Sequence, residues 1–129
     1  MKNKILIVSA NYYKDFSIEL NRGANSILLK KKYKKDFISV PGVFEIPIII
    51  SKNIKKYDAF IALGCVIKGE TPHFDFISNA STQAIMQLSI NCKKPIGNGI
   101  ITCLNIQQAK ARGKKGKEAA NAIISVLSQ

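Results

Sequence analysis

The sequence has no tryptophan, one histidine and three cysteines among its 129 residues. The cysteines, Cys65, Cys92 and Cys103, are scattered without a C-x-x-C pair, so neither a disulfide framework nor a zinc site is expected. No apolar run approaches the roughly 20 residues that cross a bilayer, and no apolar signal region follows the first residues. These absences argue against a disulfide-rich secreted domain and against a membrane partner. We therefore expect a cytoplasmic protein whose thiols are structural.

Acidic residues are also scarce, with 8 Asp and Glu against 20 Lys and Arg, which gives a formal net charge of +12. Such a charge makes nucleic-acid binding a hypothesis to test. The lysines, however, are spread along the sequence in pairs and triplets, and no aromatic-basic motif of an RNA-binding sheet is present. We therefore expect no nucleic-acid partner. Small anionic substrates or a homo-oligomer are at least as compatible with the charge.

The apolar pattern predicts alternating strands and helices in a single domain that spans residues 1–129. Short apolar runs predict strands over residues 5–9, 36–40, 58–67 and 95–102. Helical stripes predict helices over residues 15 to about 30, 44–56, 72–91, 105–112 and 117–127, with a break at residues 113–116. This order predicts right-handed βαβ units and an α/β fold with a four-stranded parallel sheet between helices.

The most informative stretch is LGCVIKGETPHFD, residues 63–75, in which a strand leads through a glycine-bearing loop into a helix. Thr71 could cap that helix and Pro72 could occupy its first position. The backbone N–H groups of a helix N-terminus suit an anion. His73 would lie at the mouth of this site, where an imidazole could move protons. The alternative is an isolated surface or capping histidine.

Other candidates fall at the carboxyl ends of the predicted strands, where ligands bind in open α/β sheets. Each has a structural alternative. Tyr12 is a rim aromatic or a ring that stacks on a heterocycle, and Glu45 is a helix-start acid or a hydroxyl acceptor. Arg112 is a cation at a helix C-terminus or a phosphate clamp. The run Gly97-Asn98-Gly99 marks a place where backbone approaches a ligand or a neighbour closely.

Three motifs carry a resemblance to a known family: PGVFEIP at residues 41–47, GCVIKGETPHFD at 64–75, and GIITCLNIQQAKAR at 99–112 followed by KKGKEAANA at 114–122. In order and spacing they resemble 6,7-dimethyl-8-ribityllumazine synthase, a transferase of riboflavin biosynthesis. The resemblance implies a flavodoxin-like three-layer α/β/α sandwich. It implies condensation of 5-amino-6-(D-ribitylamino)uracil with 3,4-dihydroxy-2-butanone 4-phosphate, without cofactor or metal. It also implies a homo-oligomer, a pentamer or a multiple of pentamers.

The resemblance assigns proton transfer to His73 and stacking on the pyrimidine to Tyr12. It implies that Glu45 accepts hydrogen bonds from ribityl hydroxyls, that the backbone of residues 65–67 reads the uracil edge, and that Arg112 clamps the phosphate. The full substrate-binding set that it implies is Tyr12, Val43, Phe44, Glu45, Cys65, Val66, Ile67, Glu70, Thr71, Asn98, Arg112 and Lys115.

Some positions depart from the family pattern. Asn98 stands where many members place a phenylalanine against a neighbouring subunit's substrate, and Tyr12-Tyr13 replaces a Phe-Asn pair. The loop between Arg112 and Lys115 is shorter, and the chain starts later, which favours the smaller assemblies. Two alternatives stay open: the archaeal type of riboflavin synthase, disfavoured by GETPHFD, and a non-catalytic shell or flavin-binding protein on the same scaffold.

Overall fold

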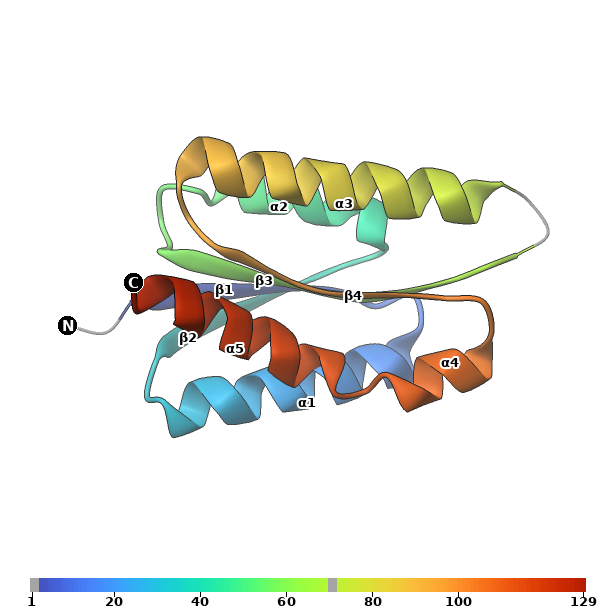
Figure 1. The fold of residues 1–129 in the computed structure, drawn as a ribbon, viewed down its shortest axis with the longest axis horizontal. Helices are drawn as coiled ribbons and strands as arrows, with labels where there is room; N and C mark the ends of the chain where they lie inside the picture. Colours follow the sequence, from blue (N-terminus) through green and yellow to red (C-terminus); the bar gives the residue numbers. More distant parts are fainter. Residues whose placement is uncertain (1–2, 70–71) are drawn as a thin grey trace.

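The computed structural model describes residues 3–69 and 72–129, and within them four strands alternate with helices (Figure 1). The strands are β1 (Lys4–Ala10), β2 (Lys34–Val40), β3 (Ala59–Ile67) and β4 (Ile96–Cys103). The α-helices are α1 (Lys14–Lys30), α2 (Ile46–Lys52), α3 (His73–Cys92), α4 (Ile106–Ala111) and α5 (Lys115–Leu127), and the 3-10 turn η1 (Val43–Glu45) precedes α2. The predicted order of elements is confirmed.

The strands form one parallel sheet in the order β2-β1-β3-β4, covered by helices on both faces. Alternate residues point to opposite faces, so Ile5 and Ile7 pack with α1 and α5 while Leu6 and Val8 pack beneath α2 and α3. Figure 1 shows these layers edge-on, with α2 and α3 above the sheet and α1, α4 and α5 below it. The three-layer α/β fold with a flavodoxin-like strand order is therefore confirmed.

Close packing between helices and the sheet explains where the glycines fall. A Cβ on Gly97 would lie 2.4 Å from the carbonyl oxygen of Ala119, and a Cβ on Gly99 would lie 2.5 Å from a methyl group of Leu63. The close neighbour predicted at the Gly97-Asn98-Gly99 run is thus α5, together with β3. The strand β4 continues through this run without interruption.

Three details differ from the sequence prediction. Helix α5 begins at Lys115, because Gly116 lets its backbone pack against the Leu20 carbonyl of α1 instead of breaking the helix. Phe76, one of the apolar residues in the helical stripe that predicted a helix over residues 72–91, is 66% exposed, since α3 covers the sheet through Ile85 and its neighbours. Pro72 occupies the N-cap position of α3 and not its first helical position, because the helix begins at His73. The predicted cap Thr71 lies outside the described residues.

None of the described helices combines the length and the apolar character needed to span a bilayer.

Candidate active site

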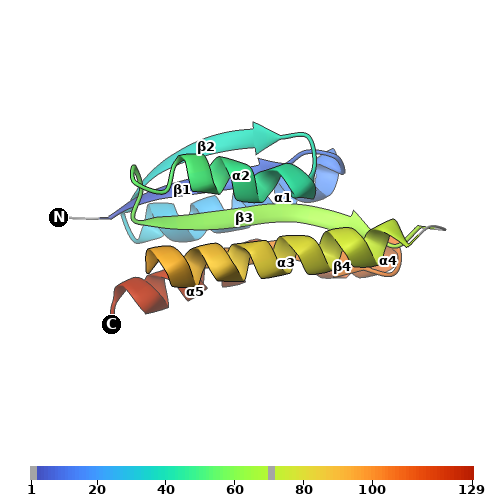
Figure 2. The same cartoon turned by 90° about the horizontal axis from the view of Figure 1, so that it is seen from above.

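A cavity of about 370 Å³ opens at the carboxyl ends of the strands, on the α2–α3 side of the sheet. Four segments supply its walls: the end of β1, the turn η1, the last residues of β3 and the first turn of α3. Figure 2 shows the end of β3 and the start of α3 at the same edge of the molecule. The predicted site residues that line the cavity are Tyr12, Val43, Phe44, Cys65, Val66, Ile67 and His73.

The cavity exists because β3 and β4 extend beyond β1. The pairing of β1 with β3 ends at Ser9 and Leu63, whereas β3 pairs with β4 as far as Ile67 and Cys103. This step leaves the end of β3 without a paired strand on its β1 side. Gly64 sits at the step, and a Cβ there would lie 2.8 Å from a methyl group of Val43, so glycine allows η1 to pack on β3.

Two aromatic rings are exposed at the cavity instead of being buried. Tyr12 is 76% exposed and Phe44 is 67% exposed, although both line the cavity wall. The Tyr12 ring meets the Tyr13 ring edge-on, with 5.0 Å between centroids. Exposed aromatic rings that converge on a cavity from separate segments are typical of a site that holds a planar ligand.

His73 is the first residue of α3 and faces the same cavity. It is exposed, and it is the only histidine in the sequence. An imidazole at this position could donate or accept a proton at a ligand held between Tyr12 and the end of β3.

Glu45 does not line the cavity. Its Oε1 accepts a hydrogen bond of 2.9 Å from the backbone N–H of Gly42, which holds the turn before α2. This is the helix-start role considered in the sequence, and it occupies only one of the two carboxylate oxygens. Acceptance of a ligand hydroxyl stays a prediction.

A second cavity, of about 720 Å³, lies along the exposed edge strand β4 beside α3 and α5. Three predicted site residues line it: Asn98, Arg112 and Lys115. The Arg112 guanidinium donates a hydrogen bond of 2.9 Å to the carbonyl of Thr102, so one end of this side chain is fixed on β4. Asn98 Oδ1 accepts from the backbone N–H of Ile100 at 3.0 Å.

The predicted site residues therefore fall into two groups within one copy of the chain. The cavities that hold His73 and Arg112 share no lining residue, although both lie towards the carboxyl ends of the strands. Two further predicted residues, Glu70 and Thr71, lie outside the described residues.

The thiols at the site are not poised for nucleophilic chemistry. Burial raises the pKa of Cys65 to about 12, with the neighbouring Cys103 thiol adding to the rise. Burial also raises the pKa of Cys103. Both groups are therefore protonated near neutral pH, and Cys65 contributes shape and backbone to the cavity. In the described ranges, no three His, Cys, Asp or Glu side chains are grouped so that they could hold a metal ion.

The structure also adds cavity residues that the sequence did not single out as site residues. Tyr13, Phe74 and Ile77 line the wall, together with Gly42 and Gly69. Burial raises the pKa of Tyr13, which keeps its hydroxyl group protonated and able to donate. Tyr13 follows Tyr12 at a strand end and Phe74 follows His73, and these positions in the sequence could have predicted that both residues line the site.

Comparison with known proteins identifies the family. The family model described as 6,7-dimethyl-8-ribityllumazine synthase matches residues 2–129. A 6,7-dimethyl-8-ribityllumazine synthase of Bartonella bacilliformis is 45% identical, over 88% of this chain and 78% of the relative. The enzymes of the same name from Bartonella tribocorum and Agrobacterium fabrum are 42% and 41% identical, each over 98% of this chain and over 89% and 93% of the relative.

Proposed function

The chain belongs to the 6,7-dimethyl-8-ribityllumazine synthase family of riboflavin biosynthesis, and we propose that the cavity containing His73 is where it performs that family's condensation. The substrates are 5-amino-6-(D-ribitylamino)uracil and 3,4-dihydroxy-2-butanone 4-phosphate. The observation that carries this assignment is the convergence of Tyr12, Phe44 and His73 on one cavity at the end of β3.

The reaction needs positioning and proton transfer more than it needs a strong nucleophile. An amine of the uracil substrate adds to the butanone carbonyl and loses water to give an imine, phosphate leaves, and the ring closes with loss of a second water. Holding both substrates in register makes these steps effectively intramolecular, which is the largest available contribution. His73 moves the protons, and the Tyr12 ring stacks on the pyrimidine.

The end of β3 is suited to read the edge of the uracil ring. Cys65, Val66 and Ile67 line the cavity at the point where β3 extends beyond β1. A planar heterocycle in the cavity would lie between this backbone and the exposed rings of Tyr12 and Phe44. We propose that the second carboxylate oxygen of Glu45, which the bond to Gly42 does not use, accepts from ribityl hydroxyls that extend past η1.

We propose that each complete active site is shared by two copies of the chain in a homo-oligomer, a pentamer or a multiple of pentamers. Arg112, Lys115 and Asn98 line a cavity separate from that of His73, on the open edge of the sheet. A neighbouring copy that placed its β4 edge against the mouth of the first cavity would bring its Arg112 and Lys115 close to His73. The guanidinium and ammonium groups would then hold the phosphate.

We also propose that residues 1–129 act as one domain in the cytoplasm. The three cysteines are free, and Cys65 and Cys103 are buried, as is usual for a protein kept in a reducing compartment.

The first experiment is to record the absorbance of the lumazine product when purified protein meets both substrates, with the mass of the assembly measured on the same sample. Product that requires both substrates, with a mass equal to a multiple of five chains, supports the proposal. Turnover of lumazine alone would indicate the archaeal type of riboflavin synthase. A folded oligomer without turnover would indicate a shell or binding role.

Mixed oligomers test the shared site directly. H73A and R112A subunits are unfolded together, mixed in equal amounts and refolded. If the site is shared, about a quarter of the interfaces pair an intact His73 with an intact Arg112. At a butanone phosphate concentration well below KM, activity then rises above that of either variant alone. If both residues serve a site within one chain, mixing restores nothing.

A further inference from the structure

The fold gathers lysines that are spread along the sequence. Helices run antiparallel to the strands, so strand starts and helix ends lie together at one edge, which we call the amino rim; it is the left end of Figure 1. Eleven lysines lie at the strand starts or helix ends of this rim: Lys4, Lys30, Lys31, Lys32, Lys34, Lys35, Lys52, Lys55, Lys56, Lys93 and Lys94.

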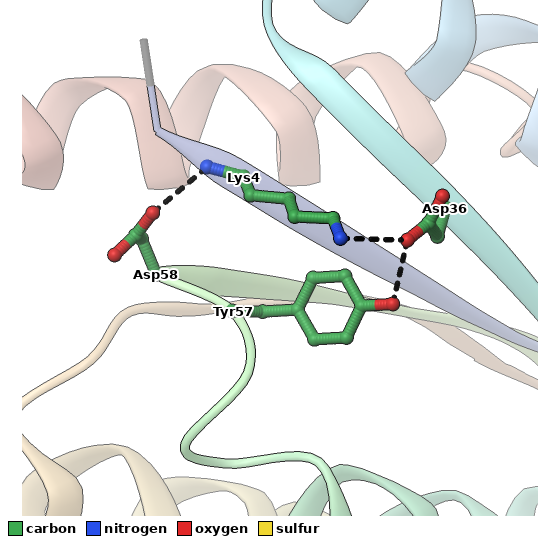
Figure 3. Close-up of polar contacts among 4 residues, drawn as sticks. All are labelled: Lys4, Asp36, Tyr57 and Asp58. Carbon is green, nitrogen blue, oxygen red and sulfur yellow. Dashed lines mark hydrogen bonds and ion pairs between the residues drawn. The ribbon is translucent and has the colours of Figure 1, made fainter. Parts of the chain in front are cut away.

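Among the acidic residues in the described ranges, Asp36 and Asp58 alone accompany them at this rim. Eleven lysines against two aspartates leave nine of the chain's +12 net charges at one end. Both aspartates are already engaged, as Figure 3 shows. Asp36 lies 3.4 Å from Lys4 Nζ and accepts from the Tyr57 hydroxyl, and Asp58 accepts from the Lys4 backbone N–H. Among the rim lysines that the structure describes, Lys4 alone pairs with a carboxylate.

Helix dipoles explain part of this pattern. A cation in the last turn of a helix is stabilising, which accounts for Lys30 in α1 and Lys52 in α2. The helix dipole does not explain Lys34, which lies at the start of β2. It does not explain Lys55 and Lys56 either, because they lie beyond α2 in the turn before β3. Crowded, unpaired like charges of this kind repel one another and oppose folding.

Two of the rim lysines also occupy a backbone conformation that disfavours them. Lys32 has a φ of 63° and Lys93 a φ of 57°, and in the described part of the chain no other residue has a positive φ. Each follows a helix end, where glycine or asparagine is the usual choice because of its freedom in the left-handed region. Lysine at both positions adds charge to the rim at the expense of stability.

We propose that the amino rim binds the phosphate backbone of duplex nucleic acid without reading its sequence. A duplex carries about one charge per 1.7 Å of axis, counting both strands, and the four-stranded sheet spans about 14 Å at this edge, so the stretch of duplex opposite it carries roughly eight phosphates. This charge matches the excess of nine at the rim. Lysine is a flexible point charge suited to such contacts, and the described part of the rim has no arginine, whose planar guanidinium is the more specific two-point partner of a base.

The inference revises the expectation, drawn from the spread of lysines in the sequence, that nucleic acid is not a partner. It does not depend on the proposed catalytic function, because the amino rim lies at the opposite end of the sheet from the cavity of His73.

The test compares two variants with equal loss of charge. K34Q/K55Q/K56Q removes three exposed lysines from the rim, and K14Q/K110Q/K117Q removes three exposed lysines from the other half of the molecule. Binding of the intact oligomer to a short fluorescein-labelled DNA duplex is measured by anisotropy between about 50 and 200 mM salt. Turnover and Tm are recorded on the same samples as a check of folding.

We expect the rim variant to lose at least about tenfold in affinity at the lowest salt, and the slope of log K against log salt to fall by two to three. The control variant should change affinity less than about threefold. Equal losses would mean that overall charge alone drives binding, which overturns the proposal. So would an unmodified protein that does not bind the duplex, or one that binds phosphatidylserine vesicles instead.

Lys32 supplies an independent test of the strained position. K32G is expected to raise Tm, because glycine relieves the left-handed backbone, and at the same time to weaken duplex binding about two- to threefold. A raised Tm with unchanged binding would overturn the assignment of the α1 end to this surface.

Discussion

The side chains at the two ends of the sheet make different kinds of contact. At the amino rim, Lys4, Asp36 and Tyr57 contact one another and join the starts of three strands (Figure 3). At the carboxyl end, Tyr12, Phe44 and His73 are exposed and face a cavity. The contacts among Lys4, Asp36 and Tyr57 hold strand starts together, whereas the exposed rings of Tyr12 and Phe44 offer surface to a ligand.

This division follows from the direction of the chain. All strands start at one edge and end at the other, so helix N-termini, with their unpaired N–H groups, lie beside the strand ends. That electrostatic arrangement favours anionic substrates at the carboxyl end and cations at the amino rim. Changes at the carboxyl end should therefore alter activity with little effect on stability, and changes within the polar contacts of the amino rim should do the reverse.

The largest expected effect is that of His73→Ala on activity. Loss of the proton-transfer group should lower kcat about a hundredfold, equivalent to about 2.7 kcal/mol of barrier, because general acid–base catalysis contributes in this range. Activity should remain measurable, since the substrates are still held together. Steady-state kinetics check this, and Tm is recorded on the same sample to confirm that the variant is folded. A folded oligomer with no turnover at all, or one with normal turnover, would contradict this division of roles.

Arg112→Ala should act on substrate binding more than on chemistry. Removing the guanidinium is expected to raise KM for the butanone phosphate about ten- to thirtyfold, because Arg112 is exposed and a charge-assisted hydrogen bond there contributes about 1.5–2 kcal/mol. The KM for the uracil substrate should change much less. Arg112→Lys is the matched control, because it keeps the charge but loses the planar two-point contact. Its KM for the butanone phosphate should lie between those of the unmodified protein and Arg112→Ala. An unchanged KM for the phosphate substrate in Arg112→Ala would remove Arg112 from the site.

Lys94→Met should lower stability and leave kcat unchanged. Lys94 Nζ donates to the carbonyl oxygens of Ile54 and Tyr57, at 2.6 and 2.8 Å, and so ties the start of β4 to the turn before β3. Methionine keeps much of the apolar stem but leaves both carbonyls without this donor, which costs about 1–2 kcal/mol. Denaturant unfolding measures the loss. A kcat that fell in proportion to stability would mean that the two ends of the sheet are not independent.

Features set by residues close together in the sequence could be predicted, whereas features set by contacts between distant segments could not. The strands, the parallel sheet and the site at the carboxyl ends followed from local apolar patterns and from strand direction. The separation of His73 from Arg112 did not, because the sequence places both at the same edge without showing that Arg112 lies on the open side of β4.

The lysines illustrate the same limit. In the sequence they are separated by whole helices and strands, so they look dispersed. The helices return the chain to the same edge after every strand, and Lys34 comes to lie beside Lys4 in the register of β1 and β2. Helix α5 shows the converse, since Gly116 looked like a helix breaker locally but is required by the Leu20 backbone that it contacts.

The smallest expected effect is a change in the pH dependence of stability in Tyr57→Phe. In the folded chain, the hydrogen bond from Tyr57, followed by Lys4, lowers the pKa of Asp36, whereas that hydrogen bond raises the pKa of Tyr57 from 10.0 to about 12. The Asp36 contribution is thus present above the ordinary carboxyl pKa and is lost as the pH falls through the lowered value. The Tyr57 contribution is present below pH 10 and is lost as the pH rises towards 12.

Phenylalanine keeps the ring contact with Phe60 and removes both effects of the hydroxyl. Tm measured from acid to alkaline pH should therefore decline less steeply in the variant above pH 10 and, more weakly, at acid pH, where Lys4 still favours the Asp36 carboxylate. The variant should have the same kcat at neutral pH as the unmodified protein, because the site lies at the other end of the sheet. An alkaline limb identical in the two proteins would show that the contact between Tyr57 and Asp36 does not contribute to holding the amino rim together.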